Sequence, residues 1–275
     1  MQLGRKNLLK IVRITDIGAF LADDTADEAV LLPKREVPAG AMVGDSIEAF
    51  IYKDSEDRPI ATTSIPPLEV GSVAVLPVSQ VTDIGAFLDW GLLKELFLPF
   101  KEQIHKLRAG DRVPVILYID KSSRLAASMK IHGRLSPACP YEKDDKVSGI
   151  IYEIRKGVGA FVAVDGKYGG LIPAQELYEK VRVGEEITAR VLKKRPDGKL
   201  DLSPRRKAYS QMKDDAETVM EAIKSYDGEL PFTDKASPEQ IKAELGMSKA
   251  AFKRAVGKLL KEGRIVIGSD SIFIK

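Results

Sequence analysis

One heptapeptide occurs twice in this chain, letter for letter. Residues 15–21 and residues 82–88 both read Thr-Asp-Ile-Gly-Ala-Phe-Leu, and a looser copy, Gly-Val-Gly-Ala-Phe-Val, stands at residues 157–162. Self-similarity of this kind indicates a structural unit that recurs along the chain. A glycine inside an apolar, β-type run marks a bend or a close approach of two backbones, as at the corner of a small barrel.

Each copy belongs to a longer unit of short apolar segments separated by turn residues. Besides the glycine-bearing segment, the first unit has such segments at residues 8–14, 29–32, 46–52 and 60–63. The second unit has them at 73–81, 96–98, 113–119 and 124–129, and the third at 147–154, 170–173, 187–192 and 199–203. Five short strands per unit, with turns at regular spacing, predict a small closed barrel. We therefore expect three barrels in tandem.

The periodicity changes after the third unit. Apolar residues then fall at i, i+3, i+4 and i+7, the pattern of an amphipathic helix, at Ala216, Val219, Met220 and Ile223. Ser237 followed by Pro238 and Gln240 is typical of a helix N-terminus, and Gly246 would end that helix.

Ser248 is the expected N-cap of a further helix. Its buried face would comprise Phe252, Ala255, Val256, Leu259 and Leu260. Two short apolar segments, 264–267 and 271–274, then predict a terminal hairpin. Helices followed by a hairpin in this order are typical of a winged helix-turn-helix.

The motifs of the third unit resemble a known domain. Its order of Gly-Ala-Phe, Gly-Leu-Ile-Pro, Val-Gly-Glu and Asp-Gly-Lys-Leu-Asp-Leu-Ser resembles the S1-type RNA-binding domain, which is an OB-fold barrel. Three such barrels followed by a winged helix, with Leu-Pro-Phe-Thr-Asp-Lys at 230–235, resemble the bacterial conserved virulence factor B family. The resemblance covers nearly the whole chain. It implies RNA binding and post-transcriptional control of gene expression, including virulence regulation.

The predicted fold class is mainly β with a C-terminal α+β module. We expect three tandem OB-fold barrels of the S1 type, at residues 1–64, 65–138 and 139–210, and a winged helix-turn-helix at residues 211–275. Proline-bearing linkers at 65–67 and 133–140 mark the first two boundaries.

The chain departs from generic S1-type barrels at two positions of each unit. Where those barrels carry an aromatic residue before Gly-Ala-Phe, this chain has Ile17, Ile84 and Val158. Where they often carry a histidine, it has Pro33, Pro99 and Pro173. Two of the three usual base-contacting side chains are therefore replaced in every unit, and we expect any single barrel to bind weakly.

Charge is distributed unevenly over a chain whose formal net charge is only +3. Residues 1–64 carry 8 basic and 11 acidic side chains, a net charge of −3, whereas residues 134–213 carry 17 and 11, a net charge of +6. Single-stranded nucleic acid needs cations for its phosphates and aromatic faces for its bases. The third barrel is therefore the expected binding module.

We assign a set of candidate RNA-binding residues on this basis. In the third barrel they are Phe161, Arg155, Lys156, Tyr168, Lys193, Lys194, Arg195, Arg205 and Arg206. In the helix of the winged module that follows Ser248 they are Lys249, Lys253 and Arg254. The alternative for the phenylalanine is a core ring of the barrel, and the alternative for the cations is a solvated surface.

Catalysis, cofactors and metals are not expected. The two histidines, His105 and His132, lack metal-ligand spacing, and the acidic turn around Asp23 has no counterpart in the other units. The single cysteine, Cys139, gives no sign of an oxidising compartment. No apolar run approaches the roughly 20 residues of a membrane span. We expect a cytoplasmic monomer without a membrane partner.

The residues favour a non-catalytic regulator that binds single-stranded RNA through the third barrel and the winged helix. Two alternatives remain open at this point. One is a protein-interaction adaptor that docks on the transcription or translation machinery. The other is a DNA-binding transcription regulator that acts through the winged helix.

Overall fold

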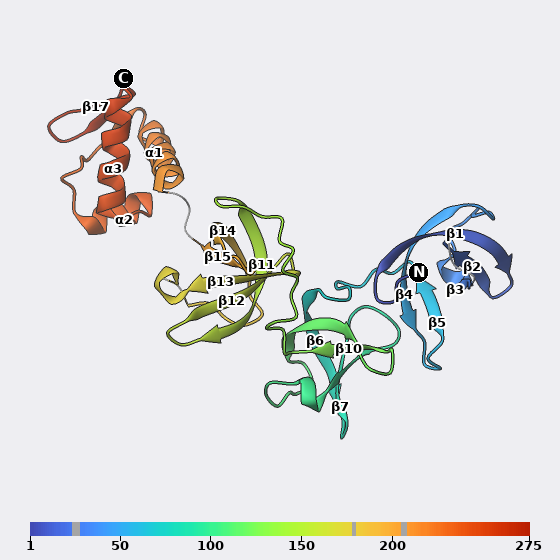
Figure 1. The fold of residues 1–275 in the computed structure, drawn as a ribbon. Helices are drawn as coiled ribbons and strands as arrows, with labels where there is room; N and C mark the ends of the chain where they lie inside the picture. Colours follow the sequence, from blue (N-terminus) through green and yellow to red (C-terminus); the bar gives the residue numbers. More distant parts are fainter. Residues whose placement is uncertain (24–27, 178–179, 205–207) are drawn as a thin grey trace. The chain divides into compact units, whose positions relative to one another are not determined.

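The computed structural model describes residues 1–23, 28–177, 180–204 and 208–275, which form two compact units. The first unit, Met1–Pro204, contains three five-stranded β modules, and the second, Arg205–Lys275, contains the three α-helices (Figure 1). The predicted fold class, mainly β with a C-terminal winged helix-turn-helix, is confirmed.

The first and third modules are closed barrels of the same topology. The strands of the first barrel are β1 (Lys6–Thr15), β2 (Gly18–Ala22), β3 (Val30–Pro33), β4 (Ser46–Lys53) and β5 (Pro59–Thr62), in the order β1-β2-β3-β5-β4. Those of the third barrel are β11 (Lys146–Arg155), β12 (Gly159–Val164), β13 (Tyr168–Pro173), β14 (Glu186–Lys194) and β15 (Leu200–Ser203), in the equivalent order. Closure removes free sheet edges, which is how small β modules avoid edge-to-edge pairing.

The second module has the same strand succession and is a nearly closed barrel: its sheet has the order β10-β9-β6-β7-β8, and the end strands β8 and β10 lie side by side. Its strands are β6 (Val73–Val81), β7 (Gly85–Leu88), β8 (Leu96–Pro99), β9 (Arg112–Ile119) and β10 (Leu125–Ser128). Its core extends into the first barrel, because Phe50 of β4 lies edge-on to Trp90 with ring centroids 5.8 Å apart.

The repeated glycine is required by a close approach of two strands. Gly18 lies opposite Pro33 and Gly159 opposite Pro173 in the strand registers. A Cβ on Gly18 would lie 2.0 Å from the Leu32 carbonyl oxygen, and one on Gly159 would lie 2.0 Å from that of Ile172. Only glycine fits such a gap, which explains why this letter recurs in the sequence motif.

The repeated proline, at 33, 99 and 173, immediately precedes a short 3-10 helix that sequence patterns did not reveal. These helices are η1 (Lys34–Glu36), η2 (Phe100–Glu102) and η3 (Ala174–Glu176). The glutamate that ends each one accepts a hydrogen bond from a hydroxyl at the end of the last strand of its barrel. The three pairs are Thr62 with Glu36 at 2.5 Å, Ser128 with Glu102 at 2.5 Å and Ser203 with Glu176 at 2.7 Å.

A β-bulge in β11 turns Tyr152 toward the second barrel. The register between β11 and β12 shifts between Ile151 and Glu153, so Tyr152 is the extra residue. Tyr152 is buried together with Ala163 of the third barrel and with Val73 and Ile116 of the second. The backbone N–H of Val73 also donates to the Gly166 carbonyl at 2.7 Å. The second and third barrels therefore share a small apolar core.

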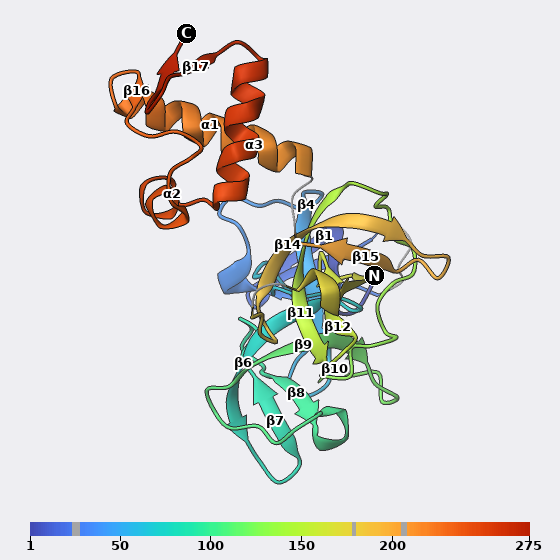
Figure 2. The same ribbon diagram turned by 90° about the vertical axis from the view of Figure 1, so that its left-hand side faces the viewer.

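The second unit is a winged helix-turn-helix with a three-stranded sheet. Its elements are α1 (Ala208–Ser225), β16 (Glu229–Leu230), α2 (Pro238–Leu245), α3 (Lys249–Lys261), β17 (Ile265–Ile267) and β18 (Ile272–Ile274). Helix α3 packs across α1 (Figure 2). The Ser237 hydroxyl accepts from the Gln240 N–H at 3.1 Å and the Ser248 hydroxyl from the Ala251 N–H at 3.2 Å, as the capping patterns predicted.

Two details of this unit differ from the sequence prediction. Leu260, expected on the buried face of α3, is 47% exposed because it lies beside the stripe formed by Phe252, Val256 and Leu259. Strand β16 was not predicted, since two residues are too short for a periodic signal. None of the helices in the described part of the chain is long and apolar enough to cross a membrane.

Candidate nucleic-acid interface

Phe161 lies on the outer face of the third barrel. Along β12 the side chains of Ala160, Val162 and Val164 point into the barrel core, so the alternation of a strand directs Phe161 outward. The ring is half-buried. Its centroid lies 5.2 Å from the edge-on ring of His132 and 6.2 Å from the ring of Tyr152. Phe161 therefore does not belong to the core of the third barrel, although part of the ring packs against the apolar cluster that this barrel shares with the second one.

Arg155 covers the Phe161 ring. Its guanidinium carbon lies 4.8 Å from the ring centroid, in a cation–π arrangement. Its Nε donates to Glu153 Oε1 at 2.6 Å, and this hydrogen bond raises the pKa of the Arg155 guanidinium. The first barrel repeats the pairing, with Arg13 lying 4.2 Å from the centroid of Phe20. In the third barrel, the Glu153 carboxylate therefore holds the flat guanidinium of Arg155 over the face of the Phe161 ring.

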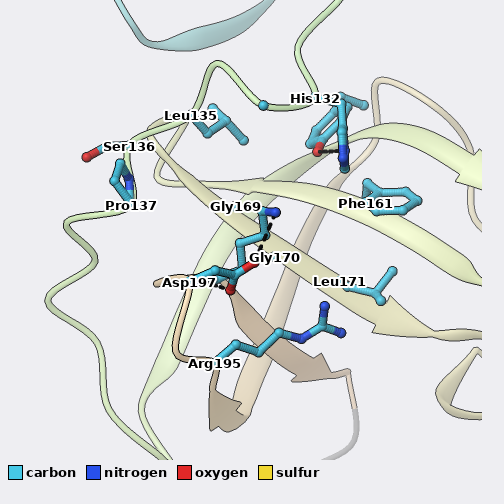
Figure 3. Close-up of a pocket in the computed structure, with 13 residues that line it drawn as sticks. His132, Leu135, Ser136, Pro137, Phe161, Gly169, Gly170, Leu171, Arg195 and Asp197 are labelled. Carbon is cyan, nitrogen blue, oxygen red and sulfur yellow. Dashed lines mark hydrogen bonds and ion pairs between the residues drawn. The ribbon is translucent and has the colours of Figure 1, made fainter.

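Beside this ring the barrel surface is hollowed into a cleft of about 440 Å³, the third-barrel cleft. Its walls carry the residues His132, Gly133, Leu135, Ser136, Pro137, Tyr152, Phe161, Gly169, Gly170, Leu171, Arg195, Asp197 and Lys199. In Figure 3 the residues His132, Leu135, Ser136 and Pro137 lie along one edge of the cleft, Phe161 and Leu171 at one end, and Arg195 across from the edge. The cleft thus combines an aromatic ring with cationic side chains.

Burial has a clear effect on the tyrosine in this wall. Together with the nearby Glu153 carboxylate, burial raises the pKa of the Tyr152 hydroxyl to about 12. The hydroxyl lies 3.5 Å from His132 Nδ1. Tyr152 therefore stays neutral at physiological pH and contributes an apolar wall with a polar tip.

The cations at the cleft are held by carboxylates of the same barrel. Arg195 Nε donates to Asp201 Oδ1 at 2.8 Å, and Lys199 Nζ lies 3.1 Å from Asp197 Oδ2. The Lys199–Asp197 pair is exposed, and exposed ion pairs contribute at most about 1 kcal/mol, so a phosphate can replace this carboxylate at little cost. The cationic excess predicted from the sequence is therefore partly neutralised at the cleft itself.

The remaining predicted cations of the third barrel are spread around it. Lys156 and Lys193 are exposed, and Lys194 Nζ donates to Glu142 Oε1 at 2.8 Å. Arg205 and Arg206 lie outside the described residues. Of the predicted set, the structure places Phe161 and Arg195 in the walls of the cleft, and Arg155 lies over the Phe161 ring without lining the cleft.

Tyr168 lies away from this group. It pairs with Val164 in the strand register, so its side chain shares the inward-facing side of the sheet. It packs against the core of the third barrel and lies edge-on to Tyr141, with ring centroids 6.2 Å apart. The alternation of β13 separates it from Phe161, and the sequence could show this only once the strand register was known.

The predicted cations of the winged module lie on α3. Lys249 Nζ donates to the Lys235 carbonyl at 3.4 Å, and Lys253 Nζ lies 3.9 Å from Asp234 Oδ2. Arg254 is exposed. Arg254 lies opposite the buried stripe of the helix and Lys253 at its flank, whereas Lys249 is half-buried at the start of the helix. Among the residues that the structure describes, no group of three or more His, Cys, Asp or Glu side chains could hold a metal ion.

Sequence reasoning missed the edge of the cleft. Leu135 and Ser136 belong to the stretch 133–140, which was interpreted only as a linker, because it has neither periodicity nor a recognisable motif. His132, just before it, was considered only as a metal ligand. Gly169 and Lys199 were likewise not singled out. A usable signal was the Gly-Gly pair at 169–170, since glycine in a strand often marks a close approach of a ligand or a second backbone.

Family models match almost the whole chain. The model described as "S1 domain" matches residues 3–64 and 70–130, "Virulence regulatory factor CvfB, second domain" matches residues 133–206, and "CvfB-like winged helix domain" matches residues 217–273. The first two modules therefore match an S1 domain, the third matches the second domain of the virulence regulatory factor, and the C-terminal unit matches its winged helix domain.

Curated relatives match over most of their length. The uncharacterized protein YitL of Bacillus subtilis is 32% identical over 96% of this chain and 91% of its own. Conserved virulence factor B of Staphylococcus epidermidis is 29% identical over 98% and 94%, and that of Staphylococcus saprophyticus is 30% identical over 84% and 80%. A solved structure of a Streptococcus pneumoniae multidomain protein with nucleic acid binding domains is 26% identical, with a TM-score of 0.44 over 99% of this chain and 98% of that one.

Proposed function

Because the chain belongs to the conserved virulence factor B family, we propose that it binds single-stranded RNA and regulates gene expression after transcription. In this proposal the protein is non-catalytic and acts in the cytoplasm, and its third barrel and winged helix hold the RNA together. S1 and winged helix domains are the modules that give the chain its nucleic-acid-binding character.

The observation that carries the proposal is the third-barrel cleft beside Phe161. Phe161 is a half-buried ring on the outer face of the barrel. An outward-facing aromatic ring on a β-barrel can serve as a stacking platform for bases, and each stacked base contributes about 1–3 kcal/mol. Arg155 and Arg195 flank the ring and the cleft, and their ion pairs can be exchanged for phosphates. Stacking is tolerant of sequence, because every base has an aromatic face. This favours an RNA ligand without a strict sequence motif.

The winged helix supplies a second cationic surface. Lys253 and Arg254 are exposed on α3, and cations on such a helix serve nucleic-acid backbones in general. Lys253→Ala combined with Arg254→Ala should weaken RNA binding at equal salt without lowering the melting temperature, since neither side chain is buried. A matched control is Lys242→Ala, which removes an exposed lysine from α2 instead.

Fluorescence anisotropy with labelled single-stranded RNA, single-stranded DNA and duplex DNA tests the proposal. Binding to the RNA should be tightest, and log Kd should change with log salt concentration, because each phosphate contact releases counterions and adds about 0.7 to the slope for a single strand. Equal or tighter binding to duplex DNA would favour a DNA-binding transcription regulator.

A protein-interaction adaptor is the second candidate, and one observation favours it. The hairpin tips of the first two barrels expose aliphatic pairs, Ile14 with Ile17 and Val81 with Ile84, at 41–62%. Exposed apolar side chains at a defined place often mark a protein contact. An adaptor would show little affinity for any of the three nucleic acids, at low salt as well as at high salt.

A further inference from the structure

We propose that the third-barrel cleft is a pocket for one nucleobase, and that the residues joining the second and third barrels form its wall. This wall, the inter-barrel segment, comprises residues 131–137. The inference rests on the proposed function and adds to it a defined site. The site is then built from the third barrel and from the segment that joins it to the second barrel, so the third barrel alone does not complete it.

The inter-barrel segment is fixed to the second barrel at its start. Ile131 is 1% exposed and packs into the core shared by Val73, Ile116 and Tyr152. Three residues later, Arg134 Nη2 donates to Glu102 Oε2 at 3.0 Å, and its guanidinium lies 4.8 Å from the Tyr118 ring centroid. An apolar anchor and a charged anchor therefore hold this end.

The same segment is fixed to the third barrel at its end. The Ser136 N–H donates to the Lys167 carbonyl at 2.9 Å, which forms an isolated parallel bridge beside β13. Pro137 lies against the turn between β14 and β15, where a Cβ on Gly198 would be 2.0 Å from the Pro137 carbonyl oxygen. Only glycine permits this contact. A segment held at both ends is a preorganised wall, which lowers the cost of ordering a ligand against it.

The interior of the cleft suits a base. At about 440 Å³ it falls in the lower part of the range of small-ligand sites, roughly 300–1,000 Å³, so it holds one nucleotide rather than several. The apolar contacts come from the Phe161 ring, Leu171 and Leu135, and the polar contacts from Ser136 and the Asp197–Lys199 pair. Rings and aliphatic groups can contact the base faces, while the polar groups can contact its edge.

The floor of the cleft is a glycine backbone, which offers a direct test. Gly169 faces the cleft, and a Cβ there would meet only the flexible Lys199 side chain, at 3.3 Å from its Cγ. A leucine at this position would fill the cleft without removing a cation or an anchor. Gly169→Leu should therefore block an inserted base and leave phosphate contacts in place.

The experiment measures Kd of the full-length protein for a fluorescein-labelled ten-nucleotide uridine RNA and for a ribose-phosphate chain of equal length without bases. The wild type should bind the base-bearing RNA about fivefold or more tightly than the abasic chain. Gly169→Leu should remove that preference, leave Kd for the abasic chain unchanged, and keep the salt slope. His132→Ala, which shortens the wall, should weaken binding of the uridine RNA about threefold. His105→Ala is its matched control, because His105 is an exposed histidine elsewhere, in the second barrel.

The outcomes separate this inference from the proposed function. If Gly169→Leu and His132→Ala both bind the uridine RNA as tightly as the wild type, the pocket is refuted while RNA binding stands. Equal affinity of the wild type for the uridine RNA and the abasic chain also refutes the pocket. If the wild type binds neither ligand, the proposed function itself fails. Should Gly169→Leu lower the melting temperature, His132→Ala decides, because its side chain is exposed and its loss leaves the strand unchanged.

Discussion

Replacement of Phe161 by alanine separates the two contributions of this ring. A fully buried phenylalanine costs about 3–5 kcal/mol of folding free energy when truncated to alanine. Phe161 is half-buried, with contacts to Tyr152, His132 and Arg155, so the expected loss of stability is about 2 kcal/mol. Domains of this kind are stable by about 5–15 kcal/mol, so the variant should remain folded at 25 °C.

Its affinity for RNA should fall by more than the loss of stability explains. Removing one stacking platform costs about 1–3 kcal/mol, which corresponds to a roughly 5- to 150-fold rise in Kd. The matched control is Phe20→Ala in the first barrel, where Arg13 covers a half-buried ring in the same way. The first barrel carries a net charge of −3, so Phe20→Ala should lower stability by a similar amount and leave RNA binding unchanged.

Fluorescence anisotropy at constant salt and a melting curve on each variant provide the two readouts. If Phe161→Ala bound RNA with wild-type affinity while folded, the third-barrel cleft would not be the RNA site. If Phe20→Ala and Phe161→Ala weakened binding equally, the charge distribution would be the wrong guide to the binding barrel.

Three further predictions concern charge, backbone and pH. Lys156→Gln should reduce the salt slope of RNA binding by about 0.7, and Arg155→Gln should reduce it by less, because Arg155 gives up its Glu153 partner to contact a phosphate. Equal slopes for both variants and the wild type would place the bound RNA strand elsewhere. Gly159→Ala should destabilise the protein by about 3 kcal/mol or more in urea unfolding, since a Cβ meets the Ile172 carbonyl oxygen, whereas Gly157→Ala, with open space at φ +78°, should cost only about 1–2 kcal/mol. Burial raises the pKa of Tyr152 from 10.0 to about 12, so the unfolded chain loses this proton first and the folded state loses stability as pH rises from 10 toward 12. In urea titrations on either side of pH 10, Tyr152→Phe should lose less unfolding free energy over that interval than the wild type, and an unchanged pH dependence would contradict the assigned burial.

The sequence alone determined the succession and type of the elements. Strand segments at 73–81 and 46–52 were predicted within one residue of β6 and β4, because alternation and turn residues are local properties of the chain. The caps Ser237 and Ser248 and the helix end at Gly246, with φ +64°, were predictable for the same reason. The three copies of Gly-Ala-Phe predicted three barrels, because each copy marks one place where paired strands come so close that only glycine fits.

Only the tertiary structure decided how the cleft is built. Sequence patterns placed Tyr168 with Phe161, yet the strand register turns the two side chains to opposite sides of the sheet. They counted the cations of the third barrel but not the carboxylates that pair with Arg155 and Arg195, since those partners depend on side-chain geometry. Residues 131–137 have no periodicity of their own. They become a wall because one end is held by the second barrel and the other by the third, and the docking of two barrels is a long-range property that no local pattern encodes.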